Sequence, residues 1–308
     1  MTRIINFGSL NIDYVYQVDH FLRAGETLAA AKRSIHMGGK GLNQTVALYR
    51  SGQSVSHVGI LGEDGKAFFD FLKSSSVQTD FLKIASNGSS GHTIIQVTPD
   101  GENAILYYPG TNHELTENLI DSALNASSQN DVVLVQNEVN DVAQIITKAK
   151  KKGLRTVFNP APFTNEVLHY PLDAVDALIL NETEAAAMTN MGNSDSLELI
   201  QELKKRLPNS LIILTTGRKG LVYTDPGING KAMPAYKMPA IDTTGAGDTF
   251  VGFALRAIVD FWEKADRKQF EKLLDDAILA AGLSVTKAGA VDSIPTLTEV
   301  KTYRLKQN

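Results

Sequence analysis

Near the end of the chain, three small residues stand directly in front of an acid. In the stretch IDTTGAGDTFV (241–251) the acid is Asp248, and the small residues are Gly245, Ala246 and Gly247. The apolar spacing that follows predicts a helix beginning here, and the first N–H groups of a helix have no partner within it. We therefore expect the turn to bind an anion, beside a carboxylate that the helix dipole favours in its charged form.

An anion site beside a carboxylate is what transfer of a phosphoryl group to an alcohol requires. Most of the charge in the loose transition state lies on the moving phosphoryl oxygens, so fixed N–H donors matter more than a strong base. The alternative is that GAGD is a capped helix start without a ligand. A dinucleotide-binding loop is a poor alternative, because its third glycine position is Phe250 and the turn lies near the C-terminus instead of after the first strand. A P-loop is excluded because the sequence contains no G-x-x-x-x-G-K-[ST].

Such a turn needs a sheet to position it, and the second half of the chain predicts one. Four short apolar runs are typical of strands buried on both faces: residues 131–136, 155–159, 176–181 and 211–217. Helical patterns separate these runs. Strands that alternate with helices indicate an α/β fold with a largely parallel sheet.

One of those helices is predicted within residues 194–207. Ser194 or Asp195 can cap it, and its apolar residues recur at spacings of three and four. We expect its buried face to consist of Leu197, Ile200, Leu203 and Leu207.

Residues 92–110 interrupt the alternation with two apolar runs around PDGEN, a hairpin signal built on Asp100 and Gly101. Six apolar side chains of this segment need a cover, namely Ile94, Ile95, Ile105, Leu106, Tyr107 and Tyr108. Two arrangements remain open. The hairpin is either a lid over a ligand or against a partner subunit, or an ordinary edge of the main sheet.

The totals restrict the class of protein. With 308 residues, of which 43% are hydrophobic, the chain can form one large domain, or one domain with a small appendage. A net charge of −4 predicts neither nucleic-acid nor membrane binding. The absence of cysteine excludes disulfides and thiolate metal sites, and the histidines never fall at metal-ligand spacing. Without a signal-peptide pattern or a long apolar run, we expect a cytoplasmic protein.

A series of ordered motifs resembles the ribokinase (PfkB) family of carbohydrate kinases over nearly the whole chain. The motifs are GSLNID (8–13), GGKGLNQTVA (38–47), GENAILYYPGTN (101–112), NPAP (159–162), NETEA (181–185), DTTGAGDTF (242–250) and VTKAGA (285–290). The resemblance implies a ribokinase-like (Rossmann-like) α/β fold, with a mostly parallel sheet covered by helices and a small β-sheet lid. We expect one kinase domain over residues 1–308, whose lid forms from segments near 10–36 and 92–110.

The resemblance also implies roles for individual residues on the sugar side. Asp248 looks like the catalytic base, with the amides of Gly245, Ala246 and Gly247 as the anion hole. The implied ligands of the sugar are Asn11, Asp13, Gly38, Gly39, Lys40, Asn43 and Glu138, together with Asp248 itself. For Lys40 the alternative is a solvated lysine near a helix start. For Glu138 it is an exposed glutamate at a helix start.

On the nucleotide side, the resemblance implies binding of ATP and Mg²⁺. Asn181 and Glu184 match the NxxE element of the magnesium and phosphate region, and their spacing also fits a plain helix cap. Further residues implied to bind the nucleotide are Thr215, Gly217 and Gly220 in TTGRKG, and Gly247. A plain turn between strands would look the same as TTGRKG.

A monovalent cation, K⁺, is the third implied partner. The positions that match its surroundings in the family are Asp242, Thr244, Ser284, Lys287, Gly289 and Ser293. Several of these ligands are backbone carbonyls in the family, so the lysine in place of the commoner arginine is expected to matter little.

We therefore expect an ATP-dependent sugar kinase, with conversion of D-ribose to ribose 5-phosphate as the leading reaction and with dimers formed through the lid. The alternatives are a kinase for another furanose, a keto-sugar or a nucleoside, and a binding protein without turnover. Two departures from the family limit these expectations. DDAILAAGLS (275–284) lacks the Asn or His that relatives often place near the adenine, and PGTNHEL (109–115) replaces the more usual GAN.

Overall fold

The chain forms two β-sheets of different size in a computed structural model that describes residues 2–192 and 194–307. The larger sheet has nine strands, in the spatial order β13 (Ile228–Pro234), β12 (Gly220–Asp225), β11 (Leu211–Thr215), β10 (Ala177–Asn181), β9 (Arg155–Asn159), β8 (Val132–Gln136), β1 (Arg3–Phe7), β4 (Ser54–Leu61) and β5 (Leu82–Ile84).

The four apolar runs of the second half form neighbouring parallel strands, β8 to β11, which confirms the predicted α/β fold. Their side chains are almost wholly buried because helices cover both faces. At the far edge β12 and β13 run antiparallel. A short helical turn, Gly217–Lys219, joins β11 to β12, and so short a connection permits only an antiparallel pair.

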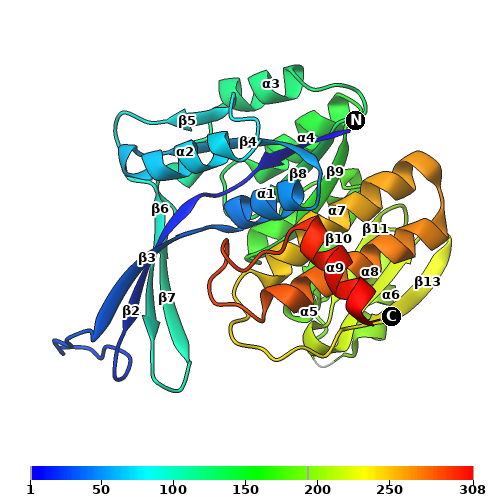
Figure 1. Cartoon of the computed structure of the whole chain (residues 1–308). Coiled ribbons are helices and arrows are strands. Elements are labelled where there is room, and N and C mark those ends of the chain that lie inside the picture. The colour runs from blue at the N-terminus through cyan, green and yellow to red at the C-terminus, as the bar shows by residue number, and fades with distance from the viewer. Residues whose placement is uncertain (1, 193, 308) are drawn as a thin grey trace.

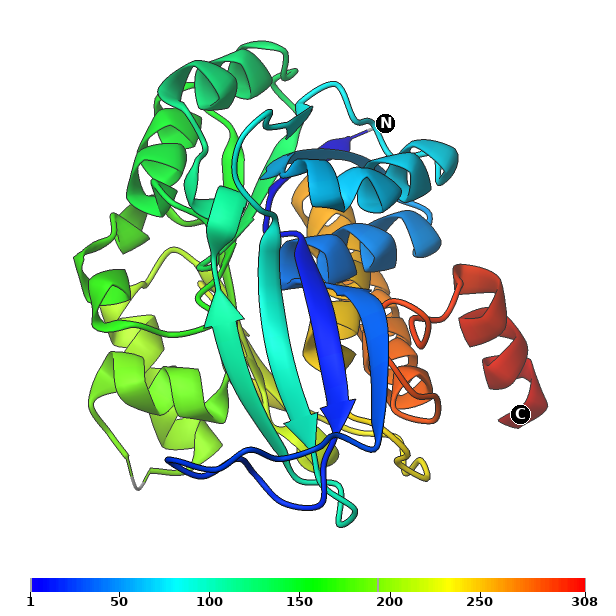
Figure 2. The same cartoon turned by 90° about the vertical axis from the view of Figure 1, so that its left-hand side faces the viewer.

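Two groups of helices pack on opposite faces of this sheet, as Figures 1 and 2 show. One face carries α1 (Lys40–Arg50), α2 (Lys66–Ser74), α7 (Ala246–Lys264), α8 (Arg267–Ser284) and α9 (Leu297–Gln307). The other face carries α3 (Glu117–Asn125), α4 (Val142–Lys151), α5 (Glu182–Thr189) and α6 (Ser196–Arg206). Alternate residues of each buried strand contribute to the two cores, as Ile4 and Ile5 do.

Helix α6 begins after Asp195, whose carboxylate accepts from the N–H groups of Leu197 and Glu198, so the predicted cap is confirmed. The predicted buried face is wrong at one position. Leu197 lies in the first turn and is 47% exposed, and Leu199 packs in the core in its place beside Ile200.

The smaller sheet projects from the body of the molecule and has the order β3 (Lys32–Gly38), β2 (Asn11–Gln17), β6 (Gly91–Val97) and β7 (Asn103–Tyr108). The predicted hairpin is β6 and β7, paired antiparallel. Because it pairs with β2 and not with the main sheet, the alternative of an ordinary edge hairpin is wrong. Figure 2 shows this sheet from its broad side.

The register of the smaller sheet sorts its side chains between two faces. Asp13, Thr93 and Tyr107 stand side by side, so they share one face. Tyr14 stands beside Ile94 and Leu106 in the same way, one residue along each strand, and these share the opposite face. The first face carries polar groups, and the second is largely apolar.

Across residues 2–192 and 194–307, no helix combines the length and the apolar character that crossing a membrane requires.

Candidate active site

Helix α7 begins in the glycine-rich turn, at the edge of the sheet where the parallel strands end. Gly245 is its N-cap and has φ 74°, a left-handed conformation that glycine adopts without strain. The turn borders a cavity of about 250 Å³, called here the carboxylate cavity. Side chains from several strand ends and helix starts line it, including Lys40, Asn159, Asn181, Glu184 and Asp248.

Asp248 lies in the first turn of α7, as predicted, and is 8% exposed. Both of its carboxylate oxygens accept hydrogen bonds from helix α1. Nδ2 of Asn43 donates to Oδ2 at 3.0 Å, and Nε2 of Gln44 donates to Oδ1 at 2.9 Å. Two donors hold the carboxylate in one orientation at the wall of the cavity.

The three amides of the turn differ in their availability. The N–H of Ala246 donates to the carbonyl of Thr243 at 3.3 Å, within the turn. The N–H groups of Gly245 and Gly247 have no backbone acceptor within the described residues, and both glycines line the carboxylate cavity. The anion hole that the sequence predicts therefore retains two free donors of three.

Asp13 and Gly38 meet where the small sheet joins the body. A Cβ on Gly38 would lie 1.9 Å from Oδ2 of Asp13, so only glycine leaves this carboxylate its place. The hydroxyl of Thr93 donates to Oδ1 of Asp13 at 2.6 Å. Burial raises the pKa of Asp13, against the effects of Thr93 and His36.

Asn11 is buried at the start of β2, and Asn112, in the short helix Gly110–His113, orients it. Nδ2 of Asn112 donates to Oδ1 of Asn11 at 2.7 Å, so the amide nitrogen of Asn11 is left for another acceptor. The backbone of Gly39, with φ 95°, passes against Ser9, Leu10 and Asn11.

Glu138 follows β8 and is bound to the start of α1. It accepts from the N–H of Lys40 at 3.0 Å and from the hydroxyl of Ser9. Burial raises the pKa of Glu138, although the charge of Lys40 opposes this. The alternative of an exposed helix-start glutamate is therefore wrong.

The ammonium group of Lys40 faces three acids. The Asp248 carboxylate, and more weakly Glu138 and Glu184, raise the pKa of Lys40 against the effect of burial. Its side chain lines the carboxylate cavity, so the alternative of a solvated lysine is wrong. The lysine brings a fixed positive charge to the cavity beside Asp248.

Asn181 and Glu184 form a reciprocal cap at the start of α5. The N–H of Glu184 donates to Oδ1 of Asn181 at 2.9 Å, and the N–H of Asn181 donates to Oε2 of Glu184 at 3.0 Å. Both residues also line the carboxylate cavity, so a helix cap and a ligand-facing pair are the same structure. Burial raises the pKa of Glu184.

A larger cavity of about 600 Å³ adjoins the first and is called here the apolar cavity. Asn181, Thr215, Thr243, Gly247 and Phe250 line both cavities. The predicted nucleotide residues Gly217 and Gly220 line the apolar cavity. Met238, Ile278, Ala281 and Val285 make much of its wall, which agrees with the absence of an Asn or His from the end of α8.

The six residues predicted around a monovalent cation lie on two segments that are bound together. Asp242 accepts from the N–H groups of Thr244 at 2.9 Å and Gly289 at 2.8 Å. Burial acts to raise the pKa of Asp242, but these hydrogen bonds outweigh it and hold the pKa below its usual range. The buried hydroxyls of Ser284 and Ser293 donate to the carbonyls of Ala281 and Ala290.

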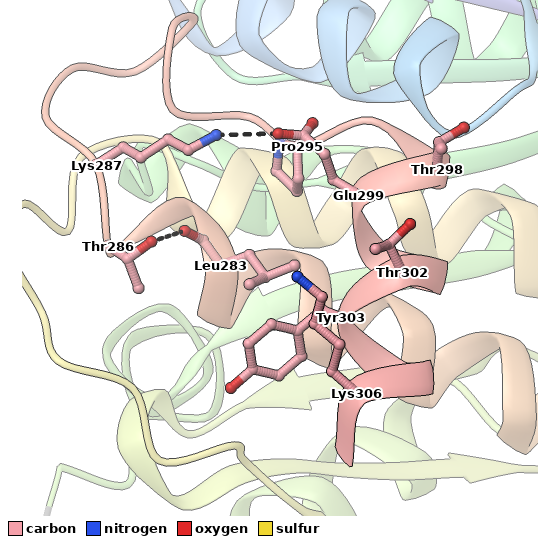
Figure 3. A pocket seen from close by; sticks show the side chains of 9 residues that line it. All are labelled: Leu283, Thr286, Lys287, Pro295, Thr298, Glu299, Thr302, Tyr303 and Lys306. Carbon is pink, nitrogen blue, oxygen red and sulfur yellow. Dashed lines mark hydrogen bonds and ion pairs between the residues drawn. The ribbon is translucent and has the colours of Figure 1, made fainter. Parts of the chain in front are cut away.

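The side chain of Lys287 leads away from this cluster. Figure 3 shows it extending to Glu299 of α9, 3.2 Å from Nζ to Oε1, and both residues line a separate hollow of about 300 Å³. None of the other predicted site residues lines that hollow. Lys287 could therefore serve a cation only through its backbone.

Sequence reasoning missed three residues of the site, namely Gln44, Asn112 and Asn159. All three stand inside motifs quoted above, and Gln44 directly follows Asn43, which was assigned a role. The signal for Gln44 is its place on a helix whose residues 41–48 are all buried, because a buried amide needs partners.

Comparison with known proteins assigns the chain to a family. The family model described as pfkB family carbohydrate kinase matches residues 1–297. A ribokinase from Haemophilus influenzae is 33% identical over 304 residues, which cover 95% of each chain.

Solved structures agree with the sequence comparison. The ribokinase of Cryptococcus neoformans in complex with ADP has a TM-score of 0.85 and 32% identity, and the match covers 98% of this chain and 100% of that one. The Arabidopsis thaliana ribokinase complexed with ribose and ATP has a TM-score of 0.83 and 28% identity, covering 98% and 97%.

Proposed function

Since the chain belongs to the pfkB family of carbohydrate kinases, we propose that it transfers the γ-phosphoryl group of ATP to the 5-hydroxyl of D-ribose. The observation that carries the proposal is the carboxylate of Asp248, held by two amides beside free N–H donors at the start of α7. The relatives named ribokinase support ribose as the acceptor.

Asp248 acts as the base in this mechanism. Its carboxylate orients the sugar hydroxyl and accepts the proton as the O–P bond forms. The N–H groups of Gly245 and Gly247 and the ammonium of Lys40 stabilise the negative charge on the moving phosphoryl oxygens. The bond from the γ-phosphorus to the bridging oxygen breaks, and ADP leaves with that oxygen.

The sugar lies between the two sheets. Asp13 and Glu138 accept hydrogen bonds from its hydroxyls, and the amide nitrogen of Asn11 donates to it. Gly38 and Gly39 let the backbone approach the ring closely. Asn43 supports the reacting end because it binds Asp248.

The nucleotide occupies the apolar cavity, with its phosphates directed towards the carboxylate cavity. The apolar wall suits the face of a purine ring. Thr215, Gly217 and Gly220 border the nucleotide. Asn181 and Glu184 offer the hard oxygen ligands that Mg²⁺ prefers, directly or through water, and the ion neutralises phosphate charge when it is bound.

A monovalent cation fits the segments around Asp242. This carboxylate ties residues 242–244 to Gly289, and the hydroxyls of Ser284 and Ser293 fix their own turns by donating to the carbonyls of Ala281 and Ala290. Such a cation would brace the turn before α7. We expect K⁺ to activate the enzyme more than Na⁺ does.

The apolar face of the small sheet is suited to cover by a second copy of the chain. Ile35, Ile94, Leu106 and Tyr108 are exposed, and the register assigns them all to the face opposite Asp13. An exposed apolar patch of this kind marks an interaction surface. A homodimer through the small sheets would bury it.

The test is ADP release with MgATP and KCl on a panel of ribose, deoxyribose, fructose and several nucleosides. Ribose should react fastest, and Asp248→Asn should lower kcat by roughly 10² to 10⁴ without loss of fold or sugar binding. Faster turnover of another compound would replace ribose and leave the mechanism standing. Sugar binding by calorimetry without turnover of any compound would favour a binding protein instead.

A further inference from the structure

Four buried amide side chains form a hydrogen-bonded chain across the parallel sheet, and one of its inner members, Gln44, also binds Asp248. They are Asn6 on β1, Gln136 at the end of β8, Gln44 on α1 and Asn159 at the end of β9. Asn6, Gln44 and Gln136 are 0% exposed, and none of these three lines the carboxylate cavity. The roles given to the site residues above leave this chain unexplained.

The direction of the first link is set by a backbone carbonyl. Nδ2 of Asn6 donates to the carbonyl of Gly41 at 2.9 Å, and a carbonyl can only accept. Oδ1 of Asn6 must therefore face Gln136, whose Nε2 donates to it at 2.9 Å. The same nitrogen donates to Oε1 of Gln44 at 2.7 Å.

The directions of the hydrogen bonds made by Gln44 and Asn159 are fixed in the same way. With its oxygen turned towards Gln136, Gln44 can turn only its nitrogen towards Asp248 and Asn159, and it donates to each at 2.9 Å. Asn159 accepts because its own nitrogen donates to the carbonyl of Ile179 at 2.9 Å. Backbone carbonyls at both ends therefore fix the orientation of every amide between them.

The arrangement leaves one polar atom of Gln136 without a hydrogen bond. Its Oε1 is buried without a hydrogen-bond partner within the described residues, while its nitrogen makes two bonds to the chain. An unpaired buried oxygen is unfavourable. The oxygen lies close to Gly8, where an added Cβ would come within 2.7 Å of it, so glycine at position 8 leaves room for Gln136.

We propose that Asn6 and Gln136 are positioning residues for the phosphoryl transfer, which act through Gln44 on the carboxylate of Asp248. The proposal rests on the proposed function, because it gives Asp248 the role of base. If Gln44 turned over, its carbonyl oxygen would face Oδ1 of Asp248, and two acceptors repel. The amide chain excludes that arrangement and keeps the carboxylate aligned with the sugar hydroxyl.

The deciding experiment is Gln136→Met in the full-length protein, because methionine is similar in length and cannot donate. We expect kcat to fall about tenfold through misalignment of the base, while the KM values for sugar and ATP change little. In the Asp248→Asn background the same substitution should cause no further loss, because its effect passes through that carboxylate.

Thr45→Val is the matched control. Oγ1 of Thr45 accepts from Nδ2 of Asn6 at 2.8 Å on a side branch, and Asn6 stays anchored on Gly41 without it. Thr45 is as buried as Gln136, so both variants should unfold at a lower temperature than the wild type. Only Gln136→Met should lose turnover.

Two results would overturn the proposal alone: wild-type kcat in Gln136→Met, or an equal loss of rate with and without Asp248→Asn. Full activity of Asp248→Asn would overturn the proposed base and the positioning role together. Should Gln136→Met not fold, Gln136→Glu takes its place in the same cycle. It keeps the shape but sets a carboxylate against the oxygens of Asn6 and Gln44, so the loss should be at least as large.

Discussion

Asn112 holds the side chain of Asn11 in one orientation. Its Oδ1 accepts from the N–H of Leu10 at 2.9 Å, so its Nδ2 must point to Oδ1 of Asn11, at 2.7 Å. The sugar would therefore meet the nitrogen of Asn11 and not the oxygen. The direction of the Asn11 donor is thus fixed by Asn112, which follows the last strand of the small sheet in the sequence.

Asn112→Asp should weaken sugar binding. Aspartate can still accept from Leu10, but its second oxygen repels Oδ1 of Asn11 and turns that amide over. We expect the sugar Kd from calorimetry to rise about tenfold, the effect of one mispaired buried hydrogen bond. Asn140→Asp is the control, because Asn140 binds the backbone of Leu115 away from the cavity. Equal sugar affinity in wild type and Asn112→Asp would contradict the orientation argument.

Gly38→Ala should displace Asp13. The added Cβ would lie 1.9 Å from Oδ2 of Asp13, and the carboxylate must leave its bond with Thr93 to make room. We expect sugar KM to rise by at least about tenfold with the melting temperature nearly unchanged, since a flexible side chain can move at little cost to the fold. Gly192→Ala, where an added Cβ meets nothing within 4 Å, is the control.

Glu184→Gln should impair the use of Mg²⁺. Glutamine keeps the hydrogen bond from the N–H of Asn181 but removes the negative charge at the cavity. We expect the Mg²⁺ concentration for half-maximal activity to rise about tenfold, as is typical when support for a metal is lost. Glu198→Gln changes the same cap chemistry at α6, with Asp195 as partner, and should leave activity alone. An equal loss of activity in both variants would show that Glu184 acts only as part of the helix cap.

His57 should make the fold sensitive to mild acid. It is 0% exposed, and burial lowers its pKa from 6.5 to about 4. His57 is neutral in both states above pH 6.5 and does not lower the free energy of unfolding there. As the pH falls from 6.5 towards 4, the unfolded chain takes up the proton first, so the free energy of unfolding decreases. The loss at pH 5 is about 2 kcal/mol. His57→Gln should show a smaller difference between urea unfolding free energies at pH 7 and pH 5, and an unchanged difference would contradict this.

Leu106→Lys should separate dimers if the small sheets form the interface. Leu106 is 67% exposed on the apolar face, where a charge cannot be buried without a partner. Sedimentation at micromolar concentration should then give a dimer for the wild type and a monomer for the variant. Lys83→Glu on the exposed end of β5, outside the small sheet, should stay dimeric. A monomeric wild type would exclude the interface.

The sequence predicts the strands of the main sheet well because they are continuous apolar runs, as in residues 155–159, which form β9 without any shift. It wrongly predicts that Leu197 is buried. Periodicity identifies the buried face of a helix but not the residue at which the helix begins. The hydrophobic pattern does not show which sheet the hairpin joins, because its partner strand β2 lies far from β6 in the sequence, near the start of the chain. Pairing at that distance leaves no periodic trace.

The glycine turn and Asp248 are found from sequence because helix-start chemistry is local. The amide chain is not, because its members lie far apart. Gln44 directly follows the assigned Asn43, but Asn6 stands between Ile5 and Phe7 in β1, and Gln136 ends the apolar run of β8. A polar residue there signals a partner across the sheet without identifying it.

The chain passes between the body and the small sheet around residues 8–10, at Gly39, at residues 85–90 and at Pro109. The proposed sugar residues Asn11 and Gly38, and Asn112 that orients Asn11, stand at or beside these passages. A change in the angle between the sheets would therefore move several of the proposed sugar contacts together, and a bound sugar would favour one angle in return. We expect occupancy of the proposed sugar site and the tilt of the small sheet to form one coupled equilibrium, which a second subunit packed on the outer face would also bias.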